Sequence, residues 1–201
     1  GDQALRNQNA GENGFNTAIG YFAGTAITTG IQNTIMGGLA GDALTTGTGN
    51  VALGYQALSN EDTGSKSVAI GRATLASQNF NGDAYNVAVG YSAGNTVSTG
   101  IKNTLIGGLA GDALTTGVEN TAIGYFALST EDTGSKNVAI GKGALAVLNF
   151  DGDGFNTAIG YNAGSAATSG VQNTLIGGLA GDALTTGTAN VAVGYLALST
   201  E

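Results

Sequence analysis

The sequence predicts an all-β protein folded as one parallel β-solenoid, and three observations support this prediction. An identical segment, GGLAGDALTTG, occurs at 37–47, 107–117 and 177–187, which defines a 70-residue unit. Each unit contains short runs of strand-forming residues between glycines. Glycine supplies 36 of the 201 residues, more than twice its usual share of roughly 7%. A regular array is the architecture that this periodicity indicates.

The 70-residue unit organises the chain as one continuous array. Residues 1–15 form the end of one unit, 16–85 and 86–155 are whole units, and 156–201 begin another. Because both ends fall inside a unit, we expect the sequence to be an interior window of a longer fibre.

Each unit contains four copies of a shorter signature: a polar residue, Thr or Val, a mostly small residue, a large aliphatic residue and Gly. From Asn16 to Asn86, the spacings between successive signatures run 17, 17, 17 and 19. Such a spacing is shorter than the roughly 34 to 47 residues of a helix-pair repeat, and it suits one coil of a solenoid. Thr, Val and Ile favour strands, and a second bend, such as TTG at 28–30 and 45–47, indicates a flattened coil.

The first residue of the signature is asparagine in every coil except the one that begins with Ser67. Asparagine tolerates the backbone conformation of bends, and stacked asparagine side chains can form a hydrogen-bonded ladder. Both interpretations are structural. The predicted ladder consists of Asn16, Asn33, Asn50, Asn86, Asn103, Asn120, Asn137, Asn156, Asn173 and Asn190.

The residue three positions after each signature start is large and apolar in all eleven coils, and we predict that these residues stack as one core column. The predicted column is Ile19, Met36, Leu53, Ile70, Val89, Ile106, Ile123, Ile140, Ile159, Ile176 and Val193.

The residue before each member of that column is Ala in eight coils and Ile35, Leu105 or Leu175 in the others. Because adjacent strand residues face opposite ways, we expect this second set to point outward. An outward apolar face suggests a cover, and we predict that other copies of the same chain supply it.

The composition excludes several kinds of chemistry. The chain has no cysteine and no histidine, so it cannot form disulfides, thiolate metal sites or histidine-based catalytic centres. Six basic residues against fourteen acidic ones argue against a nucleic-acid partner. We expect no catalytic residues, no cofactor and no enzymatic activity. No apolar run is long enough to span a bilayer, so we expect membrane attachment only through segments outside this sequence.

Acidic residues gather at two kinds of bend. Asp151 and Asp153, within 149–155, have the character of a calcium loop, but the pair is not kept in the other units. We therefore favour a solvated turn, with calcium as the weaker alternative. Glu61 and Glu131 lie in charged bends, where we expect them to keep the surface soluble.

Tyrosine recurs two residues after the core column, in alternate coils. Two coils span roughly 9 to 10 Å. The row either packs at the fibre edge and between chains or binds glycans. It consists of Tyr21, Tyr55, Tyr91, Tyr125, Tyr161 and Tyr195.

The signatures NTAIG (16–20, 120–124 and 156–160), SVAIG (67–71) and NVAIG (137–141) resemble the head repeats of trimeric autotransporter adhesins. The resemblance implies a left-handed parallel β-roll with three chains side by side, although the coils here are a few residues longer. The segments GYQAL (54–58) and GYSAG (90–94) are also similar to repeats of phage-type tail fibres.

We accordingly expect a parallel homotrimeric fibre segment, extracellular and on a cell surface or appendage, whose length is set by the number of repeats. Its expected partners are further copies of itself and, through its surface, host or matrix proteins or glycans. The alternatives are the shaft of a viral tail fibre, located in the virion tail, and a glycan-binding lectin face.

Overall fold

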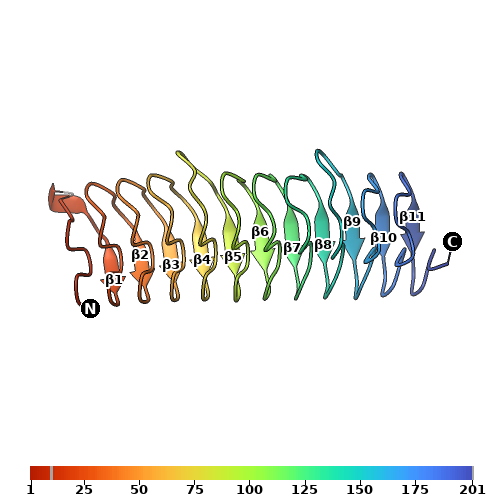
Figure 1. Ribbon diagram of the computed structural model, residues 1–201, viewed down its shortest axis with the longest axis horizontal. Helices are drawn as coiled ribbons and strands as arrows, with labels where there is room; N and C mark the ends of the chain where they lie inside the picture. The colour runs from red at the N-terminus through yellow and green to blue at the C-terminus, as the bar shows by residue number, and fades with distance from the viewer. Residues whose placement is uncertain (10, 201) are drawn as a thin grey trace.

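A computed structural model describes residues 1–9 and 11–200 as a single elongated β-solenoid (Figure 1). Eleven three-residue strands form one parallel sheet, in the order in which they occur along the chain. The strands are β1 (Thr17–Ile19), β2 (Thr34–Met36), β3 (Val51–Leu53), β4 (Val68–Ile70), β5 (Val87–Val89), β6 (Thr104–Ile106), β7 (Thr121–Ile123), β8 (Val138–Ile140), β9 (Thr157–Ile159), β10 (Thr174–Ile176) and β11 (Val191–Val193).

The coil lengths predicted from the signature spacing are confirmed. Thr17 of β1 pairs with Thr34 of β2, the shorter of the two predicted steps, whereas Val68 of β4 pairs with Val87 of β5, the longer one. The two longer coils, which lead into β5 and β9, rise above the others in Figure 1. The described part of the chain contains one short 3-10 helix, η1 (Gly11–Asn13), and no helix that is long and apolar enough to cross a membrane.

The predicted core column is wrong, because the strands face the opposite way. The central residue of each strand from β2 to β11 is buried, whereas Ile19, Met36 and Val193 of the predicted column are 53%, 46% and 66% exposed. The rest of that column is likewise on the outward side, and none of it is fully buried: Ile106, Ile159 and Ile176 are 36–37% exposed, and Leu53, Ile70, Val89, Ile123 and Ile140 are partly exposed. Leu105 and Leu175, which we expected between chains, are fully buried inside the coil.

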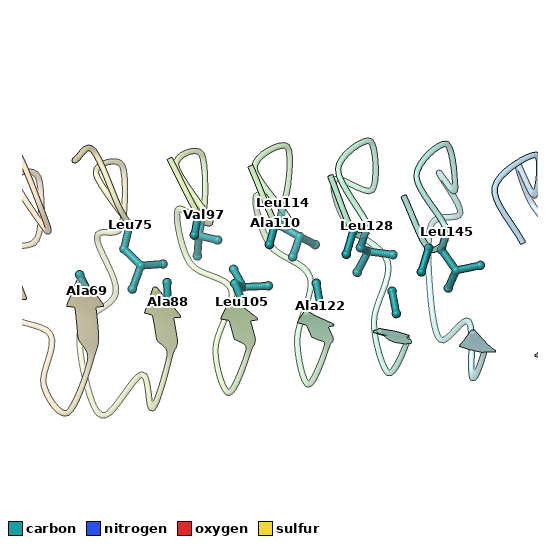
Figure 2. Close-up of a cluster of buried hydrophobic side chains, with 14 of the residues drawn as sticks. Ala69, Leu75, Ala88, Val97, Leu105, Ala110, Leu114, Ala122, Leu128 and Leu145 are labelled. Carbon is teal, nitrogen blue, oxygen red and sulfur yellow. The ribbon is translucent and has the colours of Figure 1, made fainter. Parts of the chain in front are cut away.

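The physical reason for this orientation is the fit between the strands and the opposite wall of the coil. Leu105 projects toward wall glycines: a Cβ added to Gly94 or Gly111 would lie 2.6 or 2.8 Å from its methyl carbons. In the third and fourth coils of a unit the strand supplies alanine and the wall supplies leucine, as with Leu75 and Leu128 (Figure 2). Large and small side chains therefore alternate across a narrow interior, which the bulkier outer column could not enter without overpacking.

The asparagine ladder is present inside the coil. In a typical rung, the backbone N–H of Asn50 donates to Oδ1 of Asn33 at 2.9 Å, and Nδ2 of Asn50 donates to the carbonyl of Gly64 at 2.8 Å. The same pattern links most of the ten asparagines and the glycines of the following bend. The rungs from Asn33 to Asn173 are buried, and the ladder ties the sheet to the bend along the rod.

The ladder is maintained where serine replaces asparagine. At Ser67, Gln78 donates from Nε2 to the serine hydroxyl at 2.8 Å, and its Oε1 accepts from Nδ2 of Asn86 at 2.9 Å. In the next unit the ladder position is Asn137, and the position of Gln78 is taken by the buried Leu148. Gln78 thus supplies the amide that Ser67 lacks.

Candidate interaction surface

The outward side of the sheet presents a regular surface along all eleven strands. The first and third residues of the strands face outward and form two columns, one of Thr or Val and one of large aliphatic residues. None of the described strands contains a charged residue. Ten steps between strands make this surface roughly 50 Å long. We call it the apolar face; contiguous apolar surfaces of this kind mark interaction sites.

Two rows of side chains border the apolar face. The leading margin is the position two residues before each strand, where the backbone turns sharply: Lys66, Lys102 and Lys136 have φ values of 61°, 59° and 60°. The tyrosine margin is the position two residues after each strand. The tyrosine margin contains Tyr21, Gly38, Tyr55, Arg72, Tyr91, Gly108, Tyr125, Lys142, Tyr161, Gly178 and Tyr195.

Five of the six basic residues lie in the two margins: Lys66, Lys102, Lys136, Arg72 and Lys142. The lysines of the leading margin are paired, with Nζ to carboxylate distances of 2.6 Å for Lys66–Asp83, 3.2 Å for Lys102–Glu119 and 2.6 Å for Lys136–Asp153. The basic residues of the tyrosine margin form no salt bridge within residues 1–9 and 11–200. The leading margin is therefore neutralised by its carboxylates, whereas the tyrosine margin is a basic border on an acidic chain.

The two candidate calcium ligands have separate partners. Oδ1 of Asp151 accepts from Oγ1 of Thr133 at 2.6 Å, and Oδ2 of Asp153 accepts from Nζ of Lys136 at 2.6 Å. Among the described residues, no three acidic side chains are grouped so that they could hold a metal ion. The structure therefore places Asp151 and Asp153 in a hydrogen-bonded turn and does not bring them together as a ligand set.

We expected Glu61 and Glu131 to be solvated surface charges, and this prediction is wrong. Both glutamates are fully buried. Oε1 of Glu61 accepts from the N–H of Gly64 at 2.7 Å and Oε2 accepts from Nε2 of Gln78 at 2.9 Å. Glu131 accepts from the N–H groups of Gly134 and Phe150 at 2.7 and 3.1 Å. Both glutamates occupy the interior position that Leu44 and Leu114 fill in other coils. Their carboxylates accept from a backbone N–H of their own coil and from that of Phe80 or Phe150 in the longer coil that follows.

Burial raises the pKa of Asp42, Asp112 and Glu131. Oδ1 of both aspartates is buried without a hydrogen-bond partner. A raised pKa means that the folded state binds protons more tightly than the unfolded state. The contribution of these groups to stability is therefore fully present below their ordinary pKa values, 3.8 for aspartate and 4.5 for glutamate, and is lost as the pH rises through the raised values.

We therefore expect the free energy of unfolding to increase as the pH is lowered from 7 toward the ordinary pKa values of these carboxyl groups, 3.8 and 4.5. Urea unfolding followed by circular dichroism measures this change. Asp112→Asn, which removes the charge and keeps the shape, should raise the urea midpoint at pH 7 and reduce its dependence on pH. If the urea midpoint falls on acidification in both the parent chain and the variant, the buried carboxyl groups do not have raised pKa values.

Comparisons with protein-family models, with curated protein sequences and with solved structures give no match for this chain. The candidate site is therefore defined by its own geometry, in which a flat apolar sheet lies between two margins that carry aromatic and basic side chains. Sequence reasoning identified the tyrosine row but placed the apolar face on the wrong side of the strand. The glycines of the opposite wall, at Gly24 and Gly41, were the signal that could have corrected it.

Proposed function

We propose that this chain is a structural and adhesive segment of an extracellular fibre, in which copies pack side by side through the apolar face as a parallel homotrimer. The observation that supports this proposal is the apolar face itself: two unbroken columns of uncharged side chains along all eleven strands. Large exposed apolar patches are unusual on monomeric soluble proteins and indicate association.

A second copy of the same chain is the partner that fits this face best. Every coil presents the same two outward positions at the same interval along the axis, so a parallel copy matches the spacing over the full length of the rod. The contact grows in proportion to the number of coils. Three copies arranged around one axis enclose all three apolar faces, and three is also the number implied by the resemblance to adhesin head repeats.

The repeating coil gives the chain the mechanical role of a stiff rod. Each coil adds one strand, one ladder rung and one layer of interior side chains, so the number of repeats sets the length of the rod. The continuous hydrogen bonding of the sheet and the ladder resists bending and local opening. A rod of this construction can carry a binding surface away from the structure to which it is attached, which is the property that an adhesive fibre needs.

An aspartate in the apolar face should separate the chains. For Ile106→Asp, we expect at least tenfold weaker self-association in sedimentation experiments, since an unpaired charge would be buried between chains. Val147→Asp is the matched control, because Val147 is 42% exposed, close to the 37% of Ile106, but lies outside the apolar face. A parent chain that sediments as a monomer at about 10 µM would overturn the proposal, because a stable oligomer remains associated there.

A further inference from the structure

The tyrosine margin has features that packing alone does not require. Five of its six tyrosines are between 47% and 57% exposed, and Tyr195 is 75% exposed. The tyrosines lie beyond the bend that ends each strand and so flank the apolar face at its edge. Their hydroxyl-bearing rings form one straight row along the rod, at intervals of two coils, roughly 9.6 Å.

Glycine and neighbouring aromatic rings hold these tyrosines in place. Tyr125 lies beside Gly108, where an added Cβ would be only 3.4 Å from the ring carbon Cδ2, and Tyr55 lies beside Gly38 in the same way, at 3.6 Å. The ring of Tyr125 also meets the edge of Phe126, with centroids 4.3 Å apart. The rings are therefore positioned in advance, and binding a ligand would cost them little conformational entropy.

Cations occupy the fourth coil of each unit between these rings. The guanidinium of Arg72 lies 6.0 Å from the ring centre of Tyr55 and 5.6 Å from that of Tyr91. Nζ of Lys142 lies 5.7 Å from the ring centre of Tyr161. Neither cation forms a salt bridge within the described residues, so each keeps an uncompensated positive charge beside neutral aromatic rings. On a chain with net charge −8, these positions are selective points for an anionic group.

We propose that the tyrosine margin binds an extended acidic polysaccharide along the axis of the rod. The C–H faces of sugar rings stack on exposed aromatic faces, which carry negative charge density, and the carboxylates of acidic sugars would pair with Arg72 and Lys142. The described residues enclose no pocket, so the strip suits a long, repeating polymer and not a small ligand. Single-stranded DNA also combines stackable rings with regular negative charge, so it serves as the competing polymer in the binding experiment.

This binding site goes beyond the proposed fibre and does not require the chains to associate. Affinity electrophoresis in gels containing polygalacturonate, fully methyl-esterified polygalacturonate or polyglutamate separates the contributions of sugar rings and charge. We expect polygalacturonate to retard the chain most, its methyl ester to retard it less, and polyglutamate to have little effect. Added salt should weaken the retardation by polygalacturonate.

Variants locate the binding strip. Tyr91→Ala and Arg72→Gln should each weaken binding to polygalacturonate about fivefold, through loss of ring stacking and of charge. Tyr85→Ala is the matched control, since Tyr85 is 50% exposed, as against 53% for Tyr91, but lies in the leading margin. Thermal unfolding by circular dichroism checks that each variant remains folded.

The proposal is overturned if no retardation occurs, if polyglutamate or single-stranded DNA retards the chain as strongly, or if Tyr85→Ala has the same effect as Tyr91→Ala. Sedimentation of the same samples reports separately on the fibre. If the chain is an oligomer but does not bind polygalacturonate, only the polysaccharide-binding inference is wrong. If the chain is a monomer and binds polygalacturonate, only the proposed trimer is wrong.

Discussion

Replacing Leu105 by aspartate is expected to unfold the central coils, at a cost of about 3–5 kcal/mol. Leu105 is fully buried, and its methyl groups fill the space over Gly94 and Gly111. A carboxylate there would have no cation and no donor in reach, because the surrounding side chains are aliphatic. We expect a lower thermal midpoint and loss of the β-sheet signal in circular dichroism.

The neighbouring residue supplies the control, because Ile106→Asp changes a side chain that faces outward and is 37% exposed. That variant should keep the fold and lose self-association. The two adjacent substitutions therefore have opposite signatures, one in unfolding and the other in sedimentation. If Ile106→Asp unfolds the chain and Leu105→Asp does not, the strands face the other way. The apolar face as defined above would then point into the interior.

The general architecture could be predicted from the sequence because it follows from periodicity. The strand positions, the coil lengths and the ladder rung at Asn50 all recur at fixed intervals. The direction in which a strand faces does not follow from periodicity when both of its sides are apolar. Leu105 and Ile106 are two large aliphatic residues in succession. Only the volume available beside the opposite wall determines which of the two side chains faces the interior.

The buried glutamates were missed for a related reason. Glu61 and Glu131 are each followed by Asp and by a Thr-Gly bend, a pattern typical of exposed turns. Their column, however, contains Leu44 and Leu114 in the other coils, so the position is interior whatever residue occupies it. A repeat protein is therefore better interpreted by column than by local composition.

Deleting one whole unit, residues 86–155, should leave a shorter but intact rod. The deletion joins Tyr85 to Asn156, which then occupies the ladder position of Asn86. Ala158 replaces Ala88 and Leu175 replaces Leu105 inside the coil, and both are buried in their own coils. We expect a loss of four layers, roughly 19 Å, measurable by small-angle scattering or electron microscopy, with little change in thermal midpoint.

Deleting only the segment 91–100 is the contrasting variant. This deletion removes more than half of the coil between Asn86 and Asn103, and what remains is too short to pass round the interior and return to the next strand. The Nδ2 group of Asn86 would lose the carbonyl of Gly100, to which it donates at 2.8 Å, and Val97 would be removed from the interior. This variant should lose β structure and aggregate. If the whole-unit deletion misfolds as severely, the units are not interchangeable layers and the length of the rod is not set by their number.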